Sequence, residues 1–262
     1  MEAASVVSSP APPGPASEAT EIHTRLLRLA LGVEEARAYW ERVDPSVPPA
    51  SRPLMAFQER WFGGKSLDRV RFLLAAFAER FDQFPGALEA LHRLVSADPI
   101  TRQVLCHFHV QLSDPLYRSF TGRFLVRRRG LRDASVDRDV AARWIRDEYP
   151  ERWSAATEVQ FASKLLSAAS EAGIVTSKKD PRTILIPKVS DLALGYILYT
   201  LRGLRFEGSL LENPYLASLG LTDRFLEQRL RVLSGLSYRR LGDVVDFEWA
   251  YPNLIAWAEG AA

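Results

Sequence analysis

The chain has 262 residues, a formal net charge of only +2 and 47% hydrophobic residues. This composition is typical of a folded protein with a sizeable core rather than of a disordered one. Cys106 is the only cysteine, which excludes an internal disulfide and a cysteine zinc cluster and fits a reducing, cytoplasmic location.

Residues 1–20 are rich in Ala, Pro and Ser, and we expect a disordered tail there. This stretch contains no Lys or Arg and is followed by no apolar core, so we expect no signal peptide. No apolar run in the chain approaches the roughly 18 residues of a membrane span, so a membrane partner is not expected.

Residues 21–130 read as an N-terminal helical domain, because apolar residues recur there every three or four positions. Ser66 is suited to cap one of its helices. Asp98-Pro99 and Asp114-Pro115 each predict a helix start, since Asp caps a helix and Pro suits its first turn.

The most informative stretch runs from Ser154 to Pro187. Ser154 is a good helix N-cap, and Gly173 can supply a left-handed helix exit. One apolar helix face is expected between them, and two β-branched runs, 174–176 and 183–186, enclose a polar tip and predict a small β-hairpin. The inward helix positions would be Val159, Ala162, Leu165, Leu166 and Ala169.

A helix followed by a hairpin is the second half of a winged helix-turn-helix, which usually places its helix in the DNA major groove and its wing on phosphates. The helix is expected to expose Gln160, Ser163, Lys164 and Ser167, of which the first three would lie nearest the bases. The wing would contribute Lys178, Lys179 and Arg182. Since the helix has no Arg, we expect binding dominated by phosphates with modest sequence preference.

Positive charge is concentrated around this segment. Residues 101–190 hold 16 Lys and Arg against 10 Asp and Glu, whereas the rest of the chain holds 18 against 22. Within residues 115–132, six arginines occur without any Asp or Glu, among them Arg127, Arg128 and Arg129. These either form a phosphate-binding surface or belong to a solvated helix end whose arginines meet acids elsewhere, such as Asp133, Asp137 and Asp139. The interleaved Tyr117, Phe120 and Phe124 are expected in the core.

Signals for catalysis are poor. Gly63-Gly64-Lys65-Ser66 ends like a phosphate-binding loop but lacks the earlier glycine and a preceding strand. Cys106, His107 and His109 lie close together without the further ligands that a metal site needs. We therefore expect no catalytic residue, no metal and no cofactor.

The rest of the chain completes the fold prediction. Residues 244–249 could form a short strand and residues 252–259 a last helix. We expect a mainly α protein: a helical bundle with a winged helix-turn-helix-like element and one small β-hairpin. Its domain boundary is placed near residue 130, so that residues 131–262 form a C-terminal winged-helix-like domain.

Several short runs resemble the BrxA family of bacterial BREX phage-defence systems, over roughly residues 22–258. They are Arg143-Trp144-Ile145, Trp153-Ser154-Ala155-Ala156-Thr157, Lys164-Leu165-Leu166, Ala172-Gly173-Ile174-Val175, Asp114-Pro115-Leu116-Tyr117 and Gly242-Asp243-Val244-Val245. The resemblance implies a helical, non-enzymatic component with winged-helix character that binds double-stranded DNA and works with other phage-defence proteins. It assigns no individual DNA-contacting residue.

The residues and the resemblance together predict non-catalytic binding of double-stranded DNA. Two alternatives stay open: a protein-interaction adaptor, whose arginines meet an acidic partner, and an RNA-binding helical protein.

Overall fold

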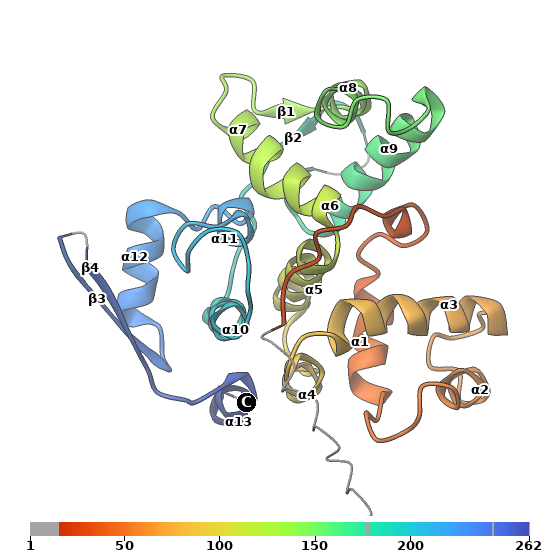
Figure 1. Ribbon diagram of the computed structural model, residues 1–262, viewed down its shortest axis with the longest axis horizontal. Helices are drawn as coiled ribbons and strands as arrows, with labels where there is room; N and C mark the ends of the chain where they lie inside the picture. Colours follow the sequence, from red (N-terminus) through yellow and green to blue (C-terminus); the bar gives the residue numbers. More distant parts are fainter. Residues whose placement is uncertain (1–15, 177–178, 243, 262) are drawn as a thin grey trace, which may run out of the picture.

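A computed structural model describes residues 16–176, 179–242 and 244–261. The fold is mainly α, as predicted, with short antiparallel strand pairs (Figure 1). No helix in these ranges is both long and apolar enough to cross a membrane.

The first part of the chain forms a group of helices that packs on one side of its last member, α5. Their bounds are η1 Arg25–Leu27, α1 Val33–Arg42, α2 Arg52–Gln58, α3 Leu67–Phe77, the π-helical turn η2 Ala78–Asp82, α4 Ala87–Arg93 and α5 Pro99–Ser113. Two of the predicted caps in this part are confirmed: the Asp98 carboxylate accepts from the backbone N–H groups of Ile100 and Thr101, and Ser66 accepts from Arg69.

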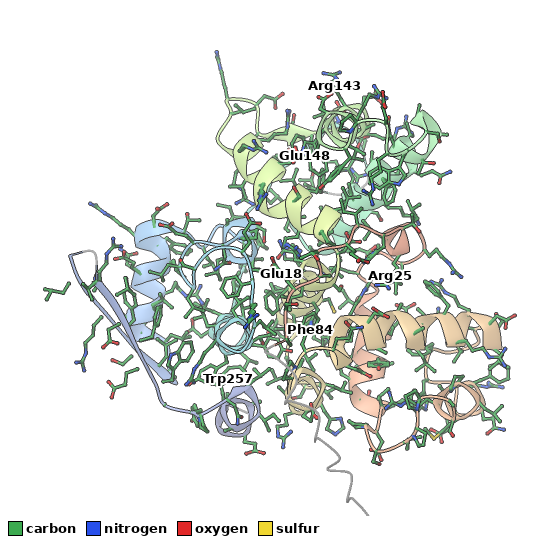
Figure 2. All side chains as sticks on the ribbon, in the orientation of Figure 1. Glu18, Arg25, Phe84, Arg143, Glu148 and Trp257 are labelled. Atoms are coloured by element: carbon green, nitrogen blue, oxygen red, sulfur yellow. The ribbon has the colours of Figure 1, made fainter. Side chains whose placement is uncertain are left out.

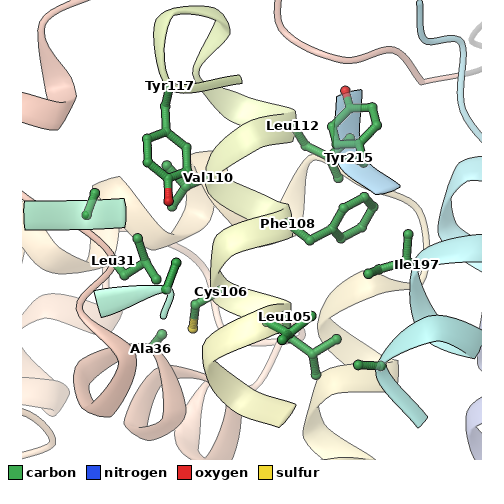
Figure 3. Packing of buried hydrophobic residues seen from close by; sticks show 14 of the residues in the cluster. Leu31, Ala36, Leu105, Cys106, Phe108, Val110, Leu112, Tyr117, Ile197 and Tyr215 are labelled. Atoms are coloured by element: carbon green, nitrogen blue, oxygen red, sulfur yellow. The ribbon is translucent and has the colours of Figure 1, made fainter. Parts of the chain in front are cut away.

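Helix α5 is the centre of the protein. Leu105, Phe108 and Leu112 are fully buried, and Figure 3 shows α5 passing between Leu31 and Ala36 on one side and Ile197 and Tyr215 on the other. A helix that is apolar on most of its circumference is covered on most sides. The buried side chains consequently form one continuous cluster across the chain.

The next segment, residues 115–186, is called the winged unit below. It comprises α6 Pro115–Ser119, the π-helical turn η3 Phe120–Phe124, α7 Leu125–Arg129, β1 Ser135–Val136, α8 Arg138–Glu148, α9 Ala155–Glu171 and β2 Arg182–Thr183. The first three run on as one helix, so the order is helix, strand, helix, helix, hairpin. This is the order of a winged helix-turn-helix.

The hairpin of the winged unit forms where the sequence predicts it. Val175 faces Ile184 across an antiparallel bridge, and the Thr176 N–H donates to the Thr183 carbonyl at 2.9 Å. On its other side, β2 pairs antiparallel with β1, Ser135 opposite Thr183. Gly173 has φ +71°, the left-handed helix exit predicted for it.

The first helix of the winged unit begins before the boundary expected at residue 130. Tyr117 and Phe120 are fully buried, as predicted; Phe124 stacks on Trp144 of α8, and Phe120 packs against the same ring at a tilt. This helix also lies so close to a later part of the chain that a Cβ on Gly122 would be 2.5 Å from Pro214. Residues 115–130 therefore pack against α8 of the winged unit, against α5 before them and against the segment around Pro214.

The last part of the chain holds a second, longer hairpin, beyond the one that was predicted. Its elements are α10 Asp191–Arg202, α11 Pro214–Ser218, α12 Asp223–Val232, β3 Leu236–Leu241, β4 Val244–Trp249 and α13 Leu254–Ala261. The predicted strand 244–249 is confirmed as β4, and β3 pairs with it antiparallel from Leu236–Trp249 to Leu241–Val244.

The predicted disordered tail is wrong for residues 16–20, which we call the N-terminal strap. The Ala19 N–H donates to the Leu112 carbonyl at 2.8 Å, and Ser17 forms a parallel bridge with Arg205. Glu18 is buried in the middle of the molecule (Figure 2), beside Arg118 at 3.5 Å and the Tyr215 hydroxyl, which donates to it. Residues 1–15 lie outside the described ranges.

Candidate nucleic-acid interface

Helix α9 has the position of a recognition helix in the winged unit. Ser154 caps it, accepting from the Thr157 N–H at 3.3 Å, as predicted. Ala162, Leu165, Leu166 and Ala169 are fully buried, but Val159, expected on the same inward face, is 38% exposed. The predicted inward face is therefore confirmed except at Val159, near the start of the helix.

The solvent face of α9 is small and nearly neutral. Gln160 and Ser163 are exposed and Lys164 is half-buried, so these three residues do share the predicted face. The Ser163 hydroxyl, however, donates back to the Val159 carbonyl at 2.9 Å. Gln160 is left as the one planar amide able to contact a base edge.

The wing lies beside the start of α8. Asp180 accepts from the Arg138 backbone N–H at 3.2 Å, which fixes the hairpin tip against that helix. Lys179 is exposed next to it. Lys178, also expected on the wing, falls outside the described residues.

Arg182 is a correction to the predicted phosphate contacts. Only 8% of it is exposed, and its guanidinium donates to Asp180 at 3.0 Å and to the Leu166 carbonyl at 2.9 Å. Because the side chain is turned inward, it fastens the wing to α9 rather than facing a ligand.

Arg129 is a second correction. Its guanidinium donates to the carbonyls of Ser218 at 2.8 Å, Leu185 at 3.2 Å and Ala217 at 3.3 Å. Burial lowers the pKa of this guanidinium, since the charged form is taken from water. Arg129 thus joins the winged unit to α11 through its two terminal nitrogens, while its Nε is buried without a partner among the described residues.

Arg127 and Arg128, which precede Arg129, have fewer contacts with the rest of the fold. The Arg128 Nε donates to the Ser135 carbonyl at 2.8 Å, and its guanidinium lies over the Phe124 ring. Part of this side chain is therefore used in holding the fold together. Arg127 is exposed, and no carboxylate among the described residues lies within 4 Å of it.

The alternative interpretation of the arginine cluster, that its arginines meet acids elsewhere, holds for two of them, although not with the three acids named for it. Asp137 caps α8, accepting from the Val140 N–H at 2.7 Å. Of the described arginines in residues 115–132, two form ion pairs, both with distant acids: Arg118 with Glu18 and Arg123 with Glu207.

Further cations of the winged unit were missed as candidates. Arg138 and Arg143 are exposed on α8, where no described carboxylate lies within 4 Å of either, and Arg143 projects from the outer side of that helix (Figure 2). The signal was present in the sequence, since Arg138 follows the helix cap Asp137 at the wing. Arg127, Arg138, Lys164 and Lys179 are exposed or half-buried; three of them were predicted and one is new, and these four residues are called the basic surface below.

The two histidines of α5 are held by hydrogen bonds inside the core. His107 is buried between the hydroxyls of Tyr117 and Ser218, each at 2.9 Å, and His109 between the Arg80 carbonyl at 2.8 Å and the Tyr196 hydroxyl at 2.7 Å. Burial lowers the pKa of each imidazole to about 3. No set of three metal-ligating side chains occurs among the residues that the structure describes.

Lys65, in the loop that resembles a phosphate-binding motif, forms an ion pair with Glu35 at 3.2 Å. That loop joins α2 to α3 and has no strand before it, so its backbone lacks the strand–loop–helix setting of a phosphate cradle.

Comparison with known proteins adds no relative to this description. No family model, no curated protein and no solved structure matches the chain.

Proposed function

We propose that this protein binds double-stranded DNA through its winged unit and does so without catalysing a reaction. The observation that carries the proposal is the element order of residues 115–186, together with an exposed face on α9 and a wing whose tip is held against the start of α8. This arrangement is the one that winged helix-turn-helix proteins use to seat a helix in a groove and a wing on the backbone.

Charge supports a phosphate-dominated mode. Arg127, Arg138, Lys164 and Lys179 are exposed or half-exposed, and among the described residues none of them pairs with a carboxylate. Cations of this kind attract the duplex backbone and displace its condensed counterions. Base reading by α9 is weak in this proposal, because Gln160 is its one suitable side chain.

The first test compares two charge-reversal variants of the whole chain, one in the winged unit and one, as a control, near α3. Lys164→Glu with Lys179→Glu is expected to weaken binding to a labelled duplex of about 25 base pairs by at least tenfold, for every sequence alike. The control, Lys65→Glu with Arg71→Glu, makes the same change of charge on the α3 side and is expected to bind within about twofold of the wild type.

Fluorescence anisotropy at low salt measures both variants. Equal affinities for the two double variants would remove the winged unit from the proposal. Tighter binding to a structured RNA than to the duplex would favour the RNA-binding alternative, and no binding to either would favour the adaptor.

The resemblance to the BrxA family extends the proposal to phage defence. In that role the protein would supply DNA binding to a larger system whose other components carry the enzymatic steps. Genes for a methyltransferase and an ATPase beside this one, and loss of phage resistance on its deletion, are the expected observations. An isolated gene without effect on phage plating would contradict this extension while leaving DNA binding standing.

A further inference from the structure

The end of the chain repeats the architecture of the winged unit. Helices α11 and α12 are joined by a turn with Gly220 at φ +72°, and α12 leads through Gly235, at φ +90°, into the β3–β4 hairpin. In the winged unit, α8, α9, Gly173 and the wing follow one another in the same order. Figure 1 shows α12 with the hairpin beside it, on the other side of α10 and α11 from α5.

Three sides of α12 are used by the fold. Leu226 and Leu230 point into the core. Glu227 accepts from Arg240 of β3, which fixes the helix to the hairpin. Arg229 donates to the Val189 carbonyl at 3.0 Å and to Asp191 at 2.5 Å, which fixes the helix to the start of α10.

The fourth side of α12 faces solvent and carries Arg224, Gln228 and Arg231, all exposed. Their spacing of four and three residues places them in one row along the helix. Arg224 has no carboxylate within 4 Å among the described residues, and Arg231 lies 3.7 Å from Glu227, which Arg240 already holds. Two guanidinium forks and an amide are therefore presented outward on a rigid helix.

This set of side chains suits base edges in a major groove. Arg donates two parallel hydrogen bonds to guanine, and Gln can both donate to and accept from adenine. Phe225 and Val232 flank the row at 51% and 74% exposure, and apolar groups of this kind contact the thymine methyl. In contrast, the solvent face of α9 offers one amide and no guanidinium.

The carboxylates near α12 do not oppose this reading. Asp223 lies in the first turn of the helix, and Glu227 is turned toward the hairpin. Asp246 and Glu248 are exposed on β4 and alternate with half-buried residues, so they lie on the hairpin face that points away from α12.

We infer that α12 is a second DNA-contacting helix and the one that reads sequence, through Arg224, Gln228 and Arg231. The inference rests on the proposed function for its ligand class, but it concerns a different surface. In this arrangement the winged unit supplies backbone affinity and α12 supplies discrimination between duplexes.

The test starts with the full chain and a randomised duplex library. The wild type is expected to enrich a motif and to bind the enriched duplex about tenfold more tightly than a scrambled one. Arg224→Ala with Gln228→Ala is expected to bring this ratio close to one, while affinity for the scrambled duplex stays within about threefold. Arg42→Ala with Gln58→Ala removes the same residue types from the exposed faces of α1 and α2 and is expected to keep the ratio.

Arg224→Lys protects the test against a folding defect, because it keeps the charge and removes the two-pronged donor. It is expected to lower the ratio as well. A wild type that binds duplexes without any preferred sequence, or an α12 variant that retains the full ratio, would overturn the inference and leave the proposed function intact. A wild type that binds no duplex at all would overturn both.

Discussion

Replacing Glu18 with alanine tests the N-terminal strap. The Glu18 and Arg118 side chains are each about nine-tenths buried, and the Tyr215 hydroxyl donates to the same carboxylate. Removing one partner of a buried ion pair costs about 3 to 5 kcal/mol, because the other charge is left in a poor solvent. Arg118 keeps the carbonyls of Gln111 and Ala19 as acceptors, both at 2.7 Å, so the lower end applies.

We therefore expect Glu18→Ala to lower the free energy of unfolding by about 3 kcal/mol. For a chain of 262 residues this corresponds to a fall in Tm of about 6 °C. Thermal unfolding followed by circular dichroism measures it. Glu21→Ala is the matched control, since Glu21 is exposed and forms no ion pair among the described residues. Equal melting temperatures for the two variants would show that the strap contributes no stability.

Three further predictions concern the packing. Gly122→Ala is expected to lower the Tm by several degrees, because the new Cβ would lie 2.5 Å from Pro214, and a Tm equal to the wild type would refute this contact. Arg182→Ala is expected to expose the wing to limited proteolysis by removing its bonds to Asp180 and α9, and an unchanged cleavage pattern would contradict this. Burial lowers the pKa values of His107 and His109 to about 3, so folding favours the neutral imidazoles. The free energy of unfolding is therefore expected to be highest above pH 6.5 and to fall, as the pH drops from 6.5 toward 3, by up to about 1.4 kcal/mol per pH unit for each histidine. Urea titrations of the wild type and of His107→Phe at several pH values measure this loss.

Local features of the fold were predictable because their causes are local. Asp98, Asp114 and Ser154 cap helices where their side chains meet N–H groups two or three residues later. The wing was predictable for the same reason, since its two strands are separated by one short polar tip. The alternation of Leu236 and Tyr238 before Gly242 carried a comparable signal for β3, and reading it would have predicted the second hairpin.

Non-local partners could not be predicted in this way. Arg129 points inward because the carbonyls of α11, nearly ninety residues later, lie beside it. Glu18 is ordered because Arg118 and Tyr215, from two distant helices, enclose it. A run of arginines therefore indicates where positive charge is available, but only the packing decides which guanidinium groups reach solvent.

The salt dependence of duplex binding tests most directly the claim that the basic surface of the winged unit holds the DNA backbone. With about four phosphates neutralised, the logarithm of the wild-type association constant is expected to fall with the logarithm of salt concentration at a slope of about −4. Lys164→Ala with Lys179→Ala is expected to reduce the slope to about −2. A wild-type slope near zero, or the same slope in the wild type and this variant, would contradict the claim.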